Sequence, residues 1–186
     1  MARQPGTYAT FSTTEGDIVC RLFEKEAPKT VANFTDLAEG KREWKHPSTG
    51  KKSSDRLYDG TIFHRVLPKF MVQGGGFEPG MKQKKTRGEI KNESHNGVPN
   101  KRGTLAMART SAPDSASSQF FINVVDNGFL DKKQAQDGVG YCVFGRVLEG
   151  MDVVDKIVAV PTSNKGGHQA VPVEDVTIKS VRRIDK

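Results

Sequence analysis

Residues 61–77 carry the sequence TIFHRVLPKFMVQGGGF, a largely apolar, β-prone run that includes one arginine and one glutamine. Its β-branched and aromatic residues favour strands, and Pro68 divides the run into two of them. Burying Arg65 in such a run without a partner would cost free energy. We therefore expect Arg65 to face a groove rather than the core.

The run ends in three consecutive glycines, residues 74–76. They follow a predicted strand, but no helical pattern follows them, so they fit a phosphate-cradling loop poorly. Glycine also permits a bulge and the close approach of another segment. The sequence therefore predicts a steric role for these glycines.

The rest of the chain contains further short strand patterns and two helical ones. The strands are expected as a hairpin over 8–23 and singly at 104–108, 119–123, 141–147 and 176–184. One helix is predicted to open at Ala27-Pro28 and stop at Gly40, and a short second one to cover 150–158. About eight strands without regular strand–helix alternation indicate a barrel or a sandwich, between which the pattern does not choose.

Length and charge indicate one basic domain over residues 1–186. The formal net charge is +7, and lysines and arginines gather in 41–56 and 82–87. Residues 41–60 are polar and turn-rich and are expected to form a long surface loop. A nucleic-acid surface would need interleaved aromatic residues for stacking, and Trp44 alone lies among these charges. Solvated loops are therefore favoured over a nucleic-acid partner.

Several other functions and locations are disfavoured by the sequence. The four histidines have no metal-ligand spacing, and no serine stands in a nucleophile elbow. No apolar run is long enough to span a membrane, and the first residues lack an apolar signal core, so we expect a cytoplasmic protein. Cys20 and Cys142 lie in apolar runs and are expected to be buried free thiols rather than a disulfide or a reactive pair.

Two further motifs, GTLAMA at 103–108 and SQFFIN at 118–123, follow the first in order. Together the three motifs resemble the cyclophilin family of peptidyl-prolyl isomerases, and the resemblance extends from Thr7 to Ile184. It implies a closed eight-stranded antiparallel β-barrel capped by two α-helices. It also implies an enzyme that rotates X–Pro bonds in peptides and folding proteins, with neither cofactor nor metal.

This reaction suits a site without a nucleophile or a base. Its barrier of about 18–20 kcal/mol is the loss of amide resonance as the bond twists. A cationic donor aimed at the prolyl nitrogen stabilises the twisted amide, and the resemblance assigns this role to Arg65. It implies that the substrate-binding residues are Phe70, Met71, Gln73, Ala108, Arg109, Gln119, Phe121, Phe129, Leu130 and Tyr141.

Three of these residues depart from the pattern of many relatives. Arg109 stands where many have asparagine, and Phe129 and Tyr141 stand where many eukaryotic members have tryptophan and histidine. The chain is thus most similar to the bacterial cytoplasmic branch, and we expect weaker cyclosporin binding than in tryptophan-bearing relatives. No feature indicates an obligate dimer, so we expect a monomer.

Each assignment has a plainer alternative. The pocket residues Phe70, Phe121 and Leu130 could be ordinary core, and Met71 could fill a gap. Arg65 could form a structural ion pair with a carboxylate such as Glu93. Strand alternation would send His64 to the face opposite Arg65, as a structural residue. The whole groove could serve to capture proline-containing segments, with turnover only incidental.

Overall fold

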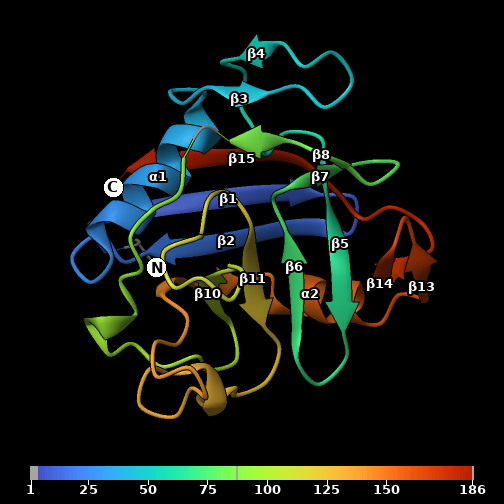
Figure 1. The fold of residues 1–186 in the computed structure, drawn as a ribbon. Helices are drawn as coiled ribbons and strands as arrows, with labels where there is room; N and C mark the ends of the chain where they lie inside the picture. Colours follow the sequence, from blue (N-terminus) through green and yellow to red (C-terminus); the bar gives the residue numbers. More distant parts are fainter. Residues whose placement is uncertain (1–3, 87, 186) are drawn as a thin grey trace.

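The computed structural model describes residues 4–86 and 88–185, in which eight antiparallel strands close into a barrel (Figure 1). The strand order around the barrel is β1-β15-β5-β6-β11-β10-β12-β2. This confirms the predicted closed barrel. The strands are β1 Thr7–Thr13, β2 Gly16–Leu22, β5 Thr61–Leu67, β6 Met71–Gly74, β10 Thr104–Met107, β11 Phe120–Asn123, β12 Val143–Glu149 and β15 Thr177–Asp185.

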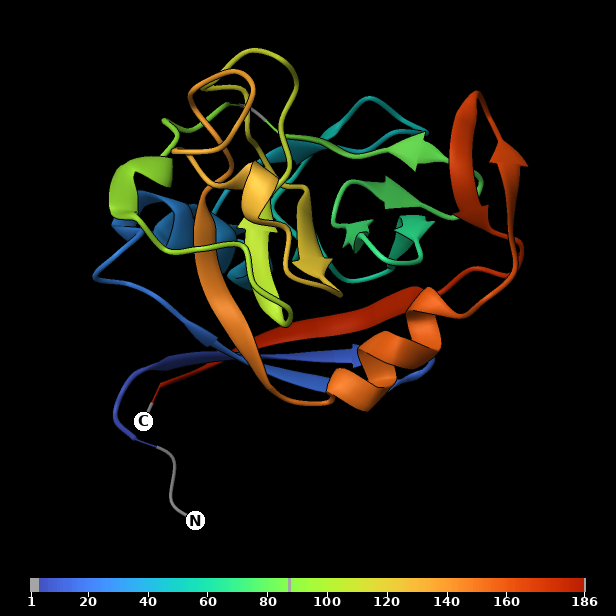
Figure 2. The ribbon, with the colours of Figure 1, turned by 90° about the horizontal axis from the view of Figure 1, so that it is seen from below.

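Two helices, α1 Pro28–Glu39 and α2 Met151–Val158, cover opposite ends of the barrel (Figures 1 and 2). Pro28 occupies the first turn of α1, where a missing N–H costs nothing, and Gly40 ends the helix with a φ of 74°. Both helices bury apolar side chains in the barrel core, among them Phe34 from α1 and Val154 from α2. Both predicted helices are thereby confirmed.

Aromatic rings fill the barrel interior. The ring centroid of Phe120 lies 5.4 Å from that of Phe11, 5.9 Å from that of Phe34 and 6.2 Å from that of Phe63, and all four side chains are fully buried. A packed interior leaves no space for a peptide, as is usual in small barrels. Any peptide site therefore lies on the outside of the barrel.

The segment 41–60, expected as a long surface loop, contains two short strands. β3 Trp44–Lys45 pairs with β4 Lys52–Ser53 and with β9 Lys85–Thr86, forming a small sheet at the top of Figure 1. Trp44 anchors it, because its ring is 4% exposed and its Nε1 donates a hydrogen bond of 2.8 Å to the Asp55 carbonyl. Two-residue strands are too short to show alternation, so the sequence did not reveal this sheet.

Other short elements lie outside the barrel. β7 Phe77–Glu78 pairs with β8 Lys82–Gln83, and β13 Thr162–Lys165 pairs with β14 His168–Pro172. Two 3-10 helices, η1 Ser94–Asn96 and η2 Gly128–Leu130, interrupt the loops. Both cysteines are buried free thiols, as predicted. Within the described ranges, the helices are too short or too polar to cross a membrane.

Candidate active site

A β-bulge in β5 decides which way Arg65 faces. Phe63 pairs with Gly74 and Arg65 pairs with Gln73, so two steps along β5 correspond to one step along β6, and His64 is the extra residue. Phe63 belongs to the barrel core, and simple alternation would place Arg65 on the same inner face. The bulge instead turns Arg65 to the outer face, as bulges beside active sites often do.

A continuous row of side chains crosses five strands on this outer face. Arg65 on β5 is opposite Gln73 on β6, which is opposite Phe121 on β11. Phe121 is opposite Ala106 on β10, which is opposite Val143 on β12. Directly opposite residues share a face, and neighbouring strands lie about 4.8 Å apart. The row therefore passes from a cation through an amide to an apolar surface.

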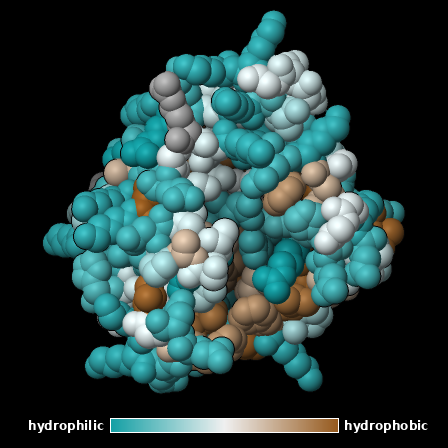
Figure 3. All heavy atoms as spheres, viewed as in Figure 1, coloured by the Kyte–Doolittle hydropathy of each residue, from teal (hydrophilic) through white to brown (hydrophobic). Residues whose placement is uncertain are grey.

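The apolar end of the row belongs to a cluster that is separate from the barrel core. We call it the outer apolar cluster. Its buried members are Met71, Ala106, Phe121, Leu130 and Val143, and its partly buried members are Phe23, Leu67, Phe70, Val98, Ala108 and Tyr141. Figure 3 shows apolar side chains gathered below the centre of this face, among polar ones. Six of the predicted site residues thus lie together here: Phe70, Met71, Ala108, Phe121, Leu130 and Tyr141.

Two of the remaining predicted residues form the polar edge of the site. The Gln73 Nε2 atom donates a hydrogen bond of 3.0 Å to the Gln119 Oε1 atom. Gln119 lies directly over Gly76, where a Cβ atom would come within 2.5 Å of the Gln119 Cγ atom. At Gly75 a Cβ atom would come within 2.8 Å of the Phe120 ring. The predicted steric role of the glycines is thereby confirmed.

Arg65 is exposed, and within the described residues its guanidinium has no hydrogen bond or ion pair. The alternative pairing with Glu93 is wrong. The Glu93 carboxylate instead accepts hydrogen bonds from Thr30 at the start of α1, from the backbone N–H at 2.7 Å and from the hydroxyl at 2.8 Å. The donors of Arg65 therefore remain available to a bound molecule.

His64, the extra residue of the bulge, also lies outside the barrel interior. Its ring packs 4.5 Å from that of Phe77 and 6.3 Å from that of His168, both on strands outside the barrel. The expectation that alternation separates His64 from Arg65 is wrong, because the bulge interrupts the alternation. Burial lowers the pKa of His64 to about 4, with smaller contributions from His168 and Arg65.

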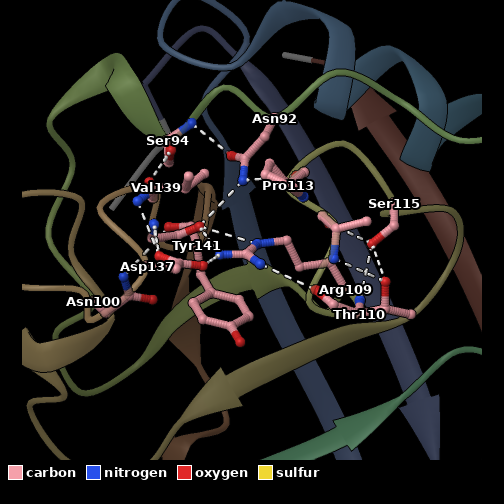
Figure 4. A network of polar contacts seen from close by, with 12 residues as sticks. Asn92, Ser94, Asn100, Arg109, Thr110, Pro113, Ser115, Asp137, Val139 and Tyr141 are labelled. Atoms are coloured by element: carbon pink, nitrogen blue, oxygen red, sulfur yellow. Dashed lines mark hydrogen bonds and ion pairs between the residues drawn. The ribbon is translucent and has the colours of Figure 1, made fainter.

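Phe129 and Arg109 lie at the margins of the cluster. Phe129 is 57% exposed, and its ring centroid is 5.8 Å from that of Phe70. The Arg109 side chain is almost fully buried and hydrogen-bonds to the loop that precedes Tyr141 (Figure 4). Its guanidinium carbon lies 4.3 Å from the centroid of the Tyr141 ring. Arg109 thus contacts a predicted site residue, while its Nε and Nη2 donors point into the loop.

Three buried asparagines support the site and were not identified from the sequence. Asn127 donates a hydrogen bond of 2.9 Å to the Phe70 carbonyl and another of 2.8 Å to Asn123, which in turn donates to Asn100. Asn100 donates at 3.4 Å to the Tyr141 carbonyl. Asparagines at strand ends and in loops usually indicate turns, so no local signal marked them.

The described residues contain no group of three histidine, cysteine, aspartate or glutamate side chains that could hold a metal ion. Among the residues that the structure describes, the face instead offers the uncommitted cation of Arg65, an amide pair beside it and an adjoining apolar surface. This set can bind an extended apolar segment and place a cationic hydrogen-bond donor against its backbone.

Comparison with known proteins gives consistent results. The family model for the cyclophilin type peptidyl-prolyl cis-trans isomerases matches residues 8–183. The chain is 56% identical over 173 residues to peptidyl-prolyl cis-trans isomerase B of Escherichia coli K12, covering 92% of this chain and 96% of that protein. It is 51% identical over 176 residues to a peptidyl-prolyl cis-trans isomerase of Acinetobacter baylyi, covering 95% and 85%.

Solved structures show the same fold. A crystal structure of a cyclophilin type peptidyl-prolyl cis-trans isomerase from Cryptosporidium parvum has a TM-score of 0.71 at 23% identity, covering 97% of this chain and 98% of that one. A second crystal structure of that protein, in the presence of the dipeptide Ala-Pro, has a TM-score of 0.68 at 24% identity, covering 96% and 99%. On the family model and the bacterial relatives, the chain belongs to the cyclophilin-type peptidyl-prolyl cis-trans isomerase family.

Proposed function

We propose that the protein catalyses cis–trans rotation of X–Pro bonds at the outer face of the barrel, with Arg65 as the catalytic residue. The observation that carries this proposal is the pairing of Arg65 with Gln73 beside the outer apolar cluster. An exposed arginine without a protein partner has hydrogen-bond donors to offer, and the adjoining apolar surface suits a pyrrolidine ring. The family and its bacterial relatives support the same reaction.

The chemistry follows from amide resonance. Twisting the bond localises the lone pair on the prolyl nitrogen, which becomes a hydrogen-bond acceptor only in the transition state. A donor placed there stabilises the transition state more than either planar isomer, which is the condition for catalysis. Arginine stays protonated at any working pH. No bond to the enzyme forms, and no proton has to be transferred.

The other residues bind and orient the substrate. Phe70, Met71, Phe121 and Leu130 surround the proline ring and exclude water, which strengthens the hydrogen bond from the arginine. Gln73 and Gln119 hold each other and present amide groups beside Arg65. The backbone near Ala108 runs beside the chain of the substrate, and Phe129 and Tyr141 stand at the edges of the cluster.

The role of Arg65 is tested with an Ala-Pro-Phe peptide, whose cis-to-trans exchange is followed at low temperature. Arg65→Ala is expected to lower kcat about 100-fold or more, as is typical when one electrostatic donor is lost. Arg65→Lys is expected to recover only part of the activity, because a lysine is a single, more hydrated point charge. Since Arg65 is exposed, both variants are expected to keep the wild-type melting temperature.

A binding module would behave differently. If the arginine serves only to hold proline-containing segments, Arg65→Ala would weaken peptide affinity while the turnover of bound peptide stays unchanged. A folded wild-type protein that fails to accelerate exchange would contradict the isomerase assignment outright. Isothermal titration with the same peptide separates affinity from turnover.

The proposal extends to the setting of the enzyme. Slow X–Pro exchange can limit folding, so folding proteins with exposed prolines are the expected substrates. We infer a monomer in the cytoplasm, where two buried free thiols remain reduced. Cyclosporin is expected to bind more weakly than to tryptophan-bearing relatives, because Phe129 offers a smaller ring at the edge of the cluster.

A further inference from the structure

Arg109 is a buried charge that directs its Nε and Nη2 donors at one loop, residues 137–140. Its side chain is 2% exposed. The Nε and Nη2 atoms donate to the Gly140 carbonyl at 3.2 and 2.8 Å, and Nη1 donates to the Thr110 carbonyl at 3.0 Å. Nη2 also pairs with the Asp137 carboxylate (Figure 4). A buried arginine is tolerated only when its donors are satisfied in this way.

Asp137 closes the same loop from the other side. Its Oδ1 atom accepts hydrogen bonds from the backbone N–H groups of Val139 at 2.9 Å and Gly140 at 3.0 Å, and its Oδ2 atom faces Arg109. The Gly140 N–H and the Arg109 guanidinium hold the pKa of Asp137 well below its usual range. The Asp137 carboxylate therefore stays ionised across the physiological pH range.

The loop 137–140 restricts the backbone of Tyr141, the residue that follows it. Gly140 has a φ of 75°, and a Cβ atom there would come within 2.6 Å of the Lys132 backbone nitrogen. The next residue, Tyr141, donates its backbone N–H to the Leu130 carbonyl at 2.9 Å. The backbone of Tyr141 is thus fixed on one side by the loop and on the other by η2.

Tyr141 has three different kinds of neighbour: a guanidinium, an aromatic ring and a cavity. The Arg109 guanidinium covers it at 4.3 Å, and the Phe121 ring of the outer apolar cluster meets it edge-on at 5.9 Å. Tyr141 also lines a cavity of about 220 Å³ together with His95, Lys132 and other polar residues. Tyr141 therefore borders both the outer apolar cluster and a largely polar cavity.

We propose that Arg109 and Asp137 form a latch that fixes the Tyr141 ring as a wall of the peptide site. In this reading Arg109 is a positioning residue, which shapes the site through Tyr141 instead of touching the substrate. The inference rests on the proposed function only in that it places the peptide on the outer apolar cluster. The latch contacts are made by residues 109–110 and 137–141, outside the bulged strand β5, so the latch is expected to govern substrate affinity more than turnover.

The test compares steady-state kinetics of wild type with Arg109→Ala and Arg109→Lys on the Ala-Pro-Phe peptide. Both variants are expected to raise KM about tenfold and to leave kcat within about twofold. Lysine is not expected to rescue KM, because it has no planar group to stack on the ring or to fork onto Gly140. Asp137→Asn is expected to raise KM less, and to add little in the Arg109→Ala background.

Arg182→Ala is the matched control. Arg182 also makes a two-bonded pair with an aspartate, Asp59, at 2.8 Å, and its side chain donates to the Val181 carbonyl at 2.9 Å. Its removal is expected to leave KM and kcat unchanged. A general effect of losing an arginine–aspartate pair would appear in this variant as well.

The position of the ring is followed directly by ¹⁹F NMR of protein labelled with 3-fluorotyrosine. The chain has three tyrosines, and Tyr141→Phe assigns the resonance of interest. That resonance is expected to shift in Arg109→Ala and Arg109→Lys, and not in Arg182→Ala. An unmoved resonance together with an unchanged KM in a folded Arg109 variant would overturn the latch.

Failure of the latch and failure of the isomerase assignment give different results. If the wild-type protein does not accelerate exchange, the isomerase assignment fails, while peptide Kd and the ¹⁹F resonance still test the latch. If Arg109→Ala does not fold, Arg109→Lys and Asp137→Asn carry the test. Rising Kd with a shifted resonance supports the latch, and no change in either refutes it.

Discussion

Among single residues, Gly76 controls the position of Gln119 most directly. Its φ is not in the left-handed region, so alanine is permitted by the backbone, but the new Cβ atom would lie 2.5 Å from the Gln119 Cγ atom. Gly76→Ala should therefore push the Gln119 side chain off Gln73, since the side chain is the part that can move. The loss of one such hydrogen bond is worth about 1 kcal/mol.

The expected result for Gly76→Ala is a fall in kcat/KM of about fivefold, with a melting temperature within a few degrees of wild type. Gly88→Ala is the matched control, because a Cβ atom at Gly88 meets no other atom within 4 Å and φ is not positive there. Equal activity of the Gly76 and Gly88 variants in the peptide assay would show that the position of Gln119 does not matter.

His64 is expected to make stability depend on pH. Its pKa is about 4 in the folded protein, mainly because of burial, and about 6.5 in an unfolded chain. The unfolded chain therefore binds more protons between these values, and stability falls as the pH drops from 6.5 towards 4. Between pH 7 and pH 5 the loss attributable to this residue is about 2 kcal/mol.

Denaturant unfolding at pH 7 and pH 5 measures this loss. His64→Leu, which does not titrate, is expected to reduce the difference between the two pH values by about 2 kcal/mol. His95→Gln, at an exposed position, serves as the control and should leave the difference as in wild type. The same pH dependence in wild type and His64→Leu would show that His64 is not responsible.

The residues of the site were accessible from sequence to different degrees. Arg65, Gln73 and Phe121 lie in strands with clear patterns, and the structure places them in one cross-strand row. The direction of the Arg109 side chain depends on a loop partner 28 residues away, and no local pattern encodes it. The buried asparagines were missed for the same reason.

At the level of elements, the start of α1 depends on a residue from another part of the chain. Ala27 at the N-cap offers no side-chain hydrogen bond. The Glu93 carboxylate instead accepts from the backbone N–H groups of Thr30 at 2.7 Å and Lys29 at 3.3 Å, and it is buried. A carboxylate at a helix N-terminus also interacts favourably with the helix dipole.

Glu93→Gln is expected to lower the free energy of unfolding by about 1–2 kcal/mol, because it removes the charge but keeps an acceptor. Glu93→Ala is expected to lower it by about 2–3 kcal/mol, since the N–H groups of the first turn lose their partner. Urea unfolding measures both. Glu89→Gln, at an exposed position, is the control, and its free energy of unfolding should stay within about 0.5 kcal/mol of wild type. An equally small change in the free energy of unfolding for Glu93→Gln would contradict the capping role.

The elements themselves were largely predictable. Pro28 and Gly40 marked both ends of α1, because each has a backbone preference that suits one end of a helix. The hairpin of β13 and β14 was missed, since every residue of β13 is exposed and polar and shows no alternation. The sequence also did not reveal which residue caps α1, because Glu93 lies more than 60 residues away along the chain.

For the whole molecule, we propose that the barrel and the small sheet of β3, β4 and β9 unfold as one domain. Trp44 on β3 packs into the main core, and Lys84 lies over its ring at 4.6 Å. The Lys84 Nζ atom also donates to the carbonyls of Leu57 at 2.8 Å and Asp59 at 3.0 Å. Trp44 thus joins the segment 41–60 to the barrel core, and Lys84 ties Trp44 to the end of that segment.

A single domain predicts coincident unfolding curves. Trp44 is the only tryptophan and reports on the small sheet by fluorescence, while far-UV circular dichroism is dominated by the barrel and helices. The two midpoints are expected to coincide in wild type and to fall together in Lys84→Met. A fluorescence transition that moves alone in Lys84→Met would show that the small sheet unfolds separately.

The overall architecture could not be predicted from the strand and helix pattern of the sequence alone. Alternating strands fit a sandwich as well as a barrel, and only the likeness of three motifs to a known family indicated closure. The structure closes the ring through β1 and β15, strands from the two ends of the sequence, and that pairing has no local signal. Distance along the chain thus limited the prediction more than composition did.

The bulge at His64 has a consequence for how this site can change by mutation. The barrel needs one spacer residue between Phe63 and Arg65, whatever its side chain, because that count sets the phase of the strand. Many substitutions of His64 preserve the register of β5. Deletion of this residue would instead turn the Arg65 guanidinium into the aromatic interior of the barrel. The reaction therefore depends on the number of residues in β5 as strictly as on the identity of Arg65.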